Sequence, residues 1–395
     1  MTRTAADPLV PGSDPARPTR LAALDVLRGI AILGTLGTNV WILTDPEGLS
    51  GYLHRISTSP TDGWMWTEKV LQQLAQGKFL GLLTVMFGIG LAIQQTSAHR
   101  AGRSWPGGYP LRAGLLFLDG LLNFLLIAEF DVLMGYAVTG CIVAFLLTRG
   151  ARAQARWLYA MLGVHLTLIT LYAGSLLLAE PSPAGERQPP APNPYADGSF
   201  WDLVRFRADH ALAFRAEAIV ILPLSIALFL LGARLFRAGV FGSEGARLRR
   251  RLVLVGFGVA APVDLLAGLA GGGDLVLITR YVVAPVVALG ILALVAEFYV
   301  RRPHTGFAGR RLSEIGRAAL SCYILQNLVA SILCYGWGFG LAARFAPTAR
   351  VPFTIGIYLT VCVVIAVFAH LWLRRFERGP VEWLWNSTYR LLNRA

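Results

Sequence analysis

Apolar residues gather into ten stretches of the length that crosses a bilayer, and short polar segments separate them. A membrane-spanning helix needs roughly 20 consecutive, mostly apolar residues. The pattern therefore predicts an all-α, polytopic integral membrane bundle of about ten transmembrane helices. We expect these helices at 24–43, 78–96, 111–128, 131–148, 157–179, 212–233, 252–270, 275–298, 318–339 and 352–373.

The segments between these stretches divide the chain into five parts. Residues 1–20 are polar and predict a disordered cytoplasmic tail. Residues 21–179 form an N-terminal half with five spans, and 212–373 form a C-terminal half with the other five. The Pro-rich segment 180–211 predicts an extended outer loop. The arginine- and tryptophan-containing end, 374–395, predicts a cytoplasmic amphipathic helix that starts at Pro380, and Trp64 and Trp66 indicate an interfacial helix in 44–77.

Composition excludes most other classes of protein. Hydrophobic residues make up 55% of the chain and charged residues 15%, and the mean hydropathy is +0.55. A soluble surface needs about a quarter of its residues charged, so the bilayer is the expected solvent and partner. The net charge of +13 favours helix ends at anionic lipid headgroups. It does not favour nucleic acid, because no basic tract is interleaved with aromatic residues.

The basic residues also predict the orientation. With the N-terminus inside, 26 of the 36 Lys and Arg residues fall on cytoplasmic ends and loops. Positive residues concentrate on the cytoplasmic side of membrane proteins. We therefore expect both termini in the cytoplasm and a multi-pass protein of the inner (plasma) membrane.

The first candidate for chemistry is the pair Asp25 and Arg28 at the inner end of the first span. Residues three apart lie on one helix face. They form either a structural ion pair at the interface or an anion-binding arginine that its aspartate holds in place.

The second candidate is the outer turn 127–132, where Glu129 and Asp131 flank Phe130. Two carboxylates in an apolar turn suit an acid or base role. Alternatively, Asp131 caps the helix that follows it.

Further ionisable residues fall near the outer level, and charges at membrane depth are costly enough to need an explanation. Together with the two carboxylates they would form one polar cavity open to the outside, or pairs that only neutralise one another. His54, in the first outer loop, is a candidate base, and no histidine spacing resembles a metal site. The further ionisable residues near the outer level are Lys78, Arg215, Glu217, Asp264 and Arg280.

Six stretches, in order along most of the chain, resemble the YeiB-like bacterial membrane proteins, also called domain-of-unknown-function family 418. The opening Leu24-Asp25-Val26-Leu27-Arg28-Gly29 is also similar, over a shorter length, to the start of transmembrane acyltransferases. The stretches contain polar residues within spans that we count as candidate substrate-binding residues, namely Asn39, Asn123, Tyr323, Gln326 and Asn327. The six stretches are 20–39, 78–94, 110–140, 229–236, 316–331 and 379–385.

The likeness to acyltransferases implies transfer of an acyl group from a cytoplasmic donor to an outer or lipid-phase acceptor. Arg28 would then bind a phosphate-bearing donor such as acyl-CoA as co-substrate, with no bound cofactor, and His54 would be the base. Family members commonly carry histidine where Asn123 stands and Trp-x-Gly-Asp where residues 128–131 stand. This departure favours carboxylate chemistry at Glu129 and Asp131.

Three functions remain open at this point. The first is acyl transfer to a hydrophobic or lipid-linked small molecule. The second is a membrane terpene or meroterpenoid cyclase that protonates its substrate with Glu129 or Asp131 and stabilises the cation on aromatic faces. The third is transport of a small molecule, because intramembrane charges also occur in transporters.

Overall fold

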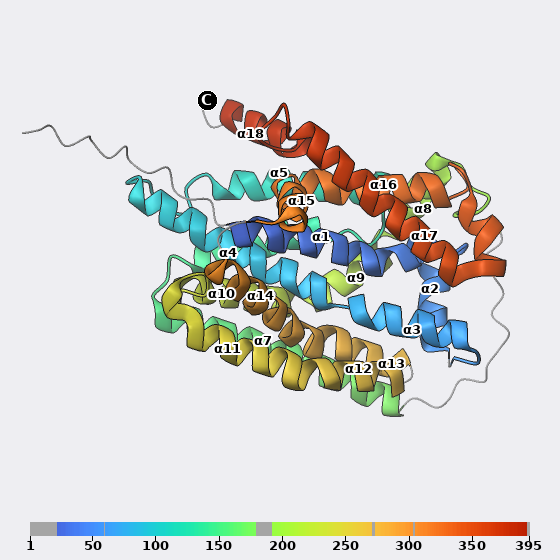
Figure 1. Cartoon of the computed structure of the whole chain (residues 1–395), viewed down its shortest axis with the longest axis horizontal. Helices are drawn as coiled ribbons and strands as arrows, with labels where there is room; N and C mark the ends of the chain where they lie inside the picture. Colours follow the sequence, from blue (N-terminus) through green and yellow to red (C-terminus); the bar gives the residue numbers. More distant parts are fainter. Residues whose placement is uncertain (1–21, 59, 179–191, 271–272, 303–304, 393–395) are drawn as a thin grey trace, which may run out of the picture.

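The structure, a computed structural model, describes residues 22–58, 60–178, 192–270, 273–302 and 305–392. Within these ranges the regular elements are all helical, and most of the helices run along the long axis of the molecule (Figure 1). The predicted tail 1–20 lies outside the described residues.

Each predicted span coincides with a helix or with consecutive helices. Within the described ranges, seven helices are long and apolar enough to cross a membrane, or up to nine if each of two bent pairs counts as one span. The predicted polytopic, all-α membrane fold is confirmed. The spanning elements are α1 (Ala22–Leu43), α4 (Lys78–Arg100), α5 (Tyr109–Leu126), α6 (Leu133–Leu146), α7 (Ala151–Leu178), α9 (Ala211–Val220) with α10 (Leu222–Arg237), α11 (Ala246–Val255) with α12 (Ala261–Ala270), α13 (Gly273–Ile278) with α14 (Ala284–Arg301), α15 (Phe307–Arg317) with α16 (Ala319–Cys334), and α17 (Leu341–Trp372).

The structure corrects the geometry of several spans. The segment expected at 131–148 forms only the 14-residue α6, about 21 Å long. The segment expected at 212–233 bends by 46° between α9 and α10, because Pro223 at the start of α10 cannot continue the preceding helix. The segment expected at 318–339 ends at Cys334, and α15 meets α16 at 89°. The helix α17 is kinked at Ala349, between Pro347 and Pro352.

Short helices join or continue the spans. These are α2 (Gly48–Ser57), α3 (Gly63–Ala75), α8 (Phe200–Asp209), α18 (Pro380–Leu392), the 3₁₀ turn η1 (Ser243–Gly245) and the π-helical turns η2 (Gly256–Ala260) and η3 (Thr279–Val283). The predicted interfacial helix corresponds to α3, and the C-terminal helix begins at Pro380 as expected. The loop predicted over 180–211 contains α8, because Ser199 and Asp202 form a reciprocal capping box that starts a helix there.

The two halves of the chain interlock in space. Helix α1 packs on α15, α16 and α17, and α4 packs on α10 and α14. Glycines bring α4 and α10 together, because a Cβ on Gly88 would overlap the backbone of Phe229 and a Cβ on Gly232 would overlap that of Val85. Small residues at helix crossings are typical of membrane bundles. The boundary between residues 179 and 212 therefore divides the sequence and not the core.

The molecule has two ends, which the length of the spans separates. The start of α1, the end of α4 and α18 lie at one end (left and upper left in Figure 1), and α15 packs on α1. We call this end, with the arginines Arg28, Arg100 and Arg317 of these helices, the basic face. The helices α2, α3 and α8 lie at the other end, the opposite face. Both described ends of the chain are thus on the basic face, which the charge count predicts to be cytoplasmic.

Candidate functional site

A cavity of about 330 Å³ enters the bundle from the basic face; we call it the basic-face cavity. It follows α4 from Gln94 to Leu83, a rise of about 16 Å. Apolar residues of α4, α5, α6 and α16 line its interior, and polar residues gather where the helices reach the basic face. Its lining includes Arg28, Ile32, Leu83, Met86, Phe87, Gln94, Arg112, Leu116, Leu133, Arg317, Leu320, Tyr323, Glu382 and Trp385.

Three arginines face this cavity from three different helices. Arg28 of α1 lies 3.6 Å from Asp25, so the predicted ion pair is present. Arg112 of α5 donates to the Gln94 side-chain oxygen at 3.0 Å. Arg317, at the end of α15, donates to a main-chain oxygen, that of Glu377, at 3.1 Å. Two of the three guanidinium groups thus meet neutral oxygens, which leaves a net positive charge at the cavity.

Helix α18 closes one side of the basic-face cavity. The Glu382 carboxylate accepts hydrogen bonds from the Leu320 main-chain N–H at 2.8 Å and from the Ser321 hydroxyl at 2.5 Å, which fixes α18 on the first turn of α16. Trp385 lines the cavity. Its indole N–H and the Nε–H of Arg317 are buried without a hydrogen-bond partner among the described residues. Buried polar groups are normally hydrogen-bonded, so these two donors suit a ligand with acceptor oxygens.

A more polar groove of about 520 Å³ adjoins the basic-face cavity; we call it the entrance groove. The two share Gln94, Tyr109 and Arg112, and the groove adds Arg103 and Trp105. The guanidinium of Arg112 also stacks on the ring of Tyr389, 4.3 Å from its centre. Together the groove and the cavity form a path from a basic, aromatic surface to an apolar interior. Such a path fits an amphiphile with an anionic head.

A smaller cavity, of about 90 Å³, lies toward the opposite face; we call it the opposite cavity. Of the predicted charged residues, it brings together Asp131, Arg215, Glu217 and Arg280. Asp131 accepts hydrogen bonds from the Asn123 amide at 2.9 Å and from the Met134 main-chain N–H at 3.2 Å. The second contact is the helix cap that the sequence offered as an alternative role. The capped carboxylate still lines the cavity.

The remaining charges of the opposite cavity are held in place. Arg215 of α9 donates to the main-chain oxygen of Asp131 at 2.8 Å and to that of Glu129. Glu217 accepts from Arg280 at 2.9 Å and from the Tyr281 hydroxyl. The cavity therefore holds two carboxylates and two guanidinium groups.

A thin wall separates the two cavities. Leu83 lines the basic-face cavity and its neighbour Thr84 lines the opposite cavity; Leu133 and Val132 divide in the same way. Phe87 on one side contacts Tyr136 on the other, with ring centres 4.7 Å apart. The Thr84 and Tyr136 hydroxyls are hydrogen-bonded at 2.8 Å. Contacting side chains, one from each cavity, thus form part of the wall between them.

Glu129 lies outside the opposite cavity in a closed ion pair. It is fully buried, and its two oxygens accept from Arg207 of α8 at 3.2 Å and from Tyr195 at 3.0 Å. Arg207 also donates to the Leu125 main-chain oxygen at 3.3 Å. The turn itself contains no basic residue, and the partner comes from 78 residues further along the chain. Glu129 has the contacts of a structural carboxylate.

Lys78 and Asp264 form a second closed pair. Their Nζ and Oδ2 atoms are 2.5 Å apart, and the Gln73 amide donates to the same Asp264 oxygen at 2.8 Å. Both charged side chains are buried. This pair lines neither cavity, so the single outer cavity predicted from all these charges holds only part of the set.

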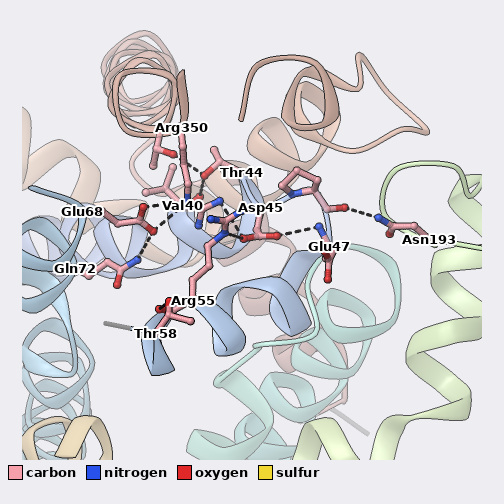
Figure 2. A network of polar contacts seen from close by, with 12 residues as sticks. Val40, Thr44, Asp45, Glu47, Arg55, Thr58, Glu68, Gln72, Asn193 and Arg350 are labelled. Carbon is pink, nitrogen blue, oxygen red and sulfur yellow. Dashed lines mark hydrogen bonds and ion pairs between the residues drawn. The ribbon is translucent and has the colours of Figure 1, made fainter. Parts of the chain in front are cut away.

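The structure also contains a network that the sequence candidates did not include (Figure 2). The Asp45 carboxylate lies 3.0 Å from Arg350 and 3.1 Å from Arg55, and the Nε of Arg350 donates to Glu68 at 3.0 Å. These residues join α2, α3 and α17 to the end of α1. The sequence feature that could have indicated this network was the position of Arg350, just before Pro352 at the start of a predicted span. The four charges alternate in sign and neutralise one another, which is typical of a structural ion-pair network.

The other predicted residues lie apart from the two cavities. His54 is exposed on α2, and Asn39 lies half-buried on α1; neither lines either cavity. Gln326 and Asn327 are fully buried on the side of α16 that carries Tyr323, and their amides have no hydrogen-bond partner within the described ranges. Within those ranges, too, no group of three or more His, Cys, Asp or Glu residues is placed to hold a metal ion.

The sequence candidates missed much of the basic-face cavity. Arg112 and Arg317 counted only as topology signals, and Glu382 and Trp385 as parts of a surface helix. All four nevertheless lie in the stretches 110–140, 316–331 and 379–385 that carried the family resemblance. The family resemblance was therefore the sequence feature that could have grouped these four residues in one site.

Comparison with known proteins places these residues in a family context. A model of the family described as protein of unknown function (DUF418) matches residues 235–391. The chain is similar to the uncharacterized protein YeiB of Escherichia coli (strain K12), with 30% identity over 391 residues that cover 93% of this chain and 96% of YeiB. It is also similar to the uncharacterized protein YxaH of Bacillus subtilis (strain 168), with 26% identity over 395 residues that cover 93% and 94% of the two chains.

Proposed function

The chain belongs to the YeiB-like DUF418 family, and from this premise we propose that it is a membrane-embedded acyltransferase. The donor enters the basic-face cavity and the acceptor reaches the wall from the opposite cavity. The observation that carries this proposal is the thin wall: Leu83 and Thr84, adjacent in sequence, line different cavities. Two substrates that approach from different sides would therefore come close to each other at this wall, with the Phe87–Tyr136 contact between them.

The donor we propose is a phosphate-bearing acyl thioester such as acyl-CoA. Guanidinium groups bind phosphate through charge-assisted hydrogen bonds, and Arg28, Arg112 and Arg317 face one cavity. The buried N–H of Trp385 adds a further donor. The apolar lining beyond the arginines, from Met86 to Leu83, suits the acyl chain. The aromatic entrance groove suits the nucleotide end.

The catalytic base we propose is Asp131. The acceptor hydroxyl gives its proton to the Asp131 carboxylate, and its oxygen attacks the thioester carbonyl. The carbon–sulfur bond breaks, a carbon–oxygen bond forms, and the leaving thiolate takes up the proton. Asn123, which donates to Asp131 at 2.9 Å, orients the carboxylate. Glu129 suits this role less, because Arg207 and Tyr195 occupy both of its oxygens.

Purified protein in lipid nanodiscs tests the proposal. It is given acetyl-CoA or octanoyl-CoA with a hydroxyl acceptor, and free thiol and acylated product are measured. We expect Asp131→Asn, which can keep the helix cap, to lower the rate about 10²–10⁴-fold, as loss of a general base does, while the protein still binds CoA. Arg317→Gln is expected to weaken CoA binding.

The matched control is Asp209→Asn, an exposed carboxylate at the end of α8 that lines neither cavity. Its rate and CoA affinity are expected to equal those of the wild type. Wild-type turnover in Asp131→Asn would remove Asp131 from the mechanism. Failure of the wild-type protein to bind CoA would remove the donor.

Transport is the second function that a specific observation favours. Cavities on both sides of a thin wall also suit alternating access, and bent helix pairs such as α9–α10 and α15–α16 occur around transporter binding sites. The carried molecule would be an amphipathic anion. Flux of such an anion into proteoliposomes with no release of thiol from acyl-CoA would favour transport over transfer.

A further inference from the structure

The opposite cavity is much smaller than the basic-face cavity, and this difference bears on the acceptor. Its volume is about 90 Å³, against about 330 Å³. An apolar cavity of about 150 Å³ holds a benzene ring. The smaller opposite cavity therefore favours a chain end of a few heavy atoms over a six-membered ring.

The contacts of its charged residues make this cavity electrically balanced. Glu217 is paired with Arg280 at 2.9 Å, and Arg215 lies against the main chain of Asp131 at 2.8 Å. A protonated amine that entered would lose its hydration without meeting a net negative charge, which is costly. A neutral group has no such cost. The cavity thus favours a neutral acceptor.

Unsatisfied polar atoms in the cavity indicate hydrogen bonding to the ligand. Thr139 of α6 is fully buried, lines the cavity, and has a hydroxyl with no hydrogen-bond partner among the described residues. The Nε–H groups of Arg215 and Arg280, which also line it, are likewise buried without a partner there. A hydroxyl group can accept from the guanidinium N–H groups and donate to the threonine oxygen. Such a ligand satisfies atoms that the protein leaves unsatisfied.

From size, charge and hydrogen bonding together, we infer that the acceptor is a neutral primary alcohol whose terminal CH₂OH group alone enters the opposite cavity. This inference rests on the proposed acyl transfer and names the acceptor class of that site. The remainder of the acceptor stays outside, so a sugar or a lipid-linked alcohol is acylated only at its primary hydroxyl.

One apolar residue whose size contributes to the width is Ile221, at the bend between α9 and α10. It lines the cavity together with Asp131, and its side chain is half-buried. Truncation to alanine widens the cavity and leaves the charged residues in place. Ile221 is therefore a specificity-determining residue and takes no part in the chemistry.

The test uses four acceptors with the protein in nanodiscs and the acyl-CoA that binds best. Glycerol and methyl glucoside carry primary hydroxyls, inositol carries only secondary hydroxyls on a ring, and ethanolamine carries an amine. We expect the primary esters to form faster than inositol esters by about tenfold or more, a ratio typical of steric discrimination in a pocket. We expect methyl glucoside to be acylated at its primary position, and ethanolamine, which is cationic, more slowly than glycerol and at oxygen.

The variants Ile221→Ala and Leu116→Ala complete the test. Ile221→Ala is expected to raise the share of secondary esters, whereas Leu116→Ala, which lines the basic-face cavity, is expected to leave it unchanged. Equal rates for inositol and glycerol, or acylation of the amine nitrogen, would overturn the inference and leave acyl transfer standing. Absence of ester from all four acceptors, although CoA is bound, would overturn both.

Discussion

Charges near the two faces of this molecule are handled in different ways. Toward the opposite face, Glu129 and Arg207, Lys78 and Asp264, and Glu217 and Arg280 form ion pairs. Around the basic-face cavity, Arg112 and Arg317 contact a side-chain amide oxygen and a main-chain oxygen, neither of which carries a charge.

A buried charge without a counter-charge is costly, so the partners of the charged residues indicate the role of each region. Pairs that close on themselves hold helices together. Arginines such as Arg112 and Arg317, whose hydrogen bonds go to neutral oxygens, suit a ligand that carries negative charge. Charge at membrane depth is therefore a weak sign of function by itself, and its partner decides the interpretation.

The strongest way to break this contrast is to open the most buried pair. Arg207→Met leaves Glu129, which is fully buried, without its cation, and we expect a loss of about 3–5 kcal/mol in the free energy of unfolding. Arg301→Met is the matched control, because Arg301 pairs with Glu297 while 75% exposed, and should cost at most about 1 kcal/mol. Thermal unfolding in detergent measures both. Equal shifts would mean that the Arg207 pair contributes no more than a surface pair.

A smaller effect is expected at the second pair, because a lysine can give up its proton when its partner is lost and an arginine cannot. Asp264→Leu should therefore cost about 2–3 kcal/mol, less than the loss at Arg207. Adding Lys78→Met in the same chain should recover most of that loss, since an apolar pair replaces the ionic one. A double variant as unstable as the single one would mean that the pair has a role beyond mutual neutralisation.

The spans, but not these partnerships, were predictable from the sequence. Hydropathy over roughly 20 residues is a local property, which is why all ten apolar segments coincide with helices. Which charge meets which is not local: Lys78 and Asp264 are 186 residues apart, and no spacing rule connects them. The bends at Ile221 and Ala318 also depend on packing, although Pro223 gave a hint of the first.

The candidate site, too, could be predicted only in part from the sequence. The outer charges Asp131, Arg215, Glu217 and Arg280 were expected together, and they line one cavity. Of the residues that line the basic-face cavity, only Arg28 and Tyr323 were among the sequence candidates, because Arg112, Arg317 and Trp385 come from three other helices. Their convergence depends on the 89° bend between α15 and α16 and on the docking of α18.

The third prediction tests the arginines of the basic-face cavity, which we propose bind the donor. Arg112→Gln removes a charge that is hydrogen-bonded to the neutral Gln94 amide oxygen and stacked on Tyr389, so the unfolding transition should stay close to that of the wild type. Loss of one charge-assisted hydrogen bond, about 1.5–3 kcal/mol, should weaken CoA binding about 10- to 100-fold. Titration of CoA at low and high salt measures this, and salt should weaken the wild type more than the variant. Unchanged affinity would place the phosphate elsewhere.

The smallest expected effect concerns a single neutral donor on α18. Trp385→Phe removes an indole N–H that is buried and makes no hydrogen bond to the described residues, so the protein loses no internal bond. CoA affinity should fall by about 0.5–1.5 kcal/mol, the net contribution of one hydrogen bond. Trp383→Phe, on the exposed side of the same helix, should bind CoA as the wild type does. Equal affinities for the two variants would make α18 only a wall of the cavity, whereas a loss confined to Trp385→Phe would make it part of the donor site.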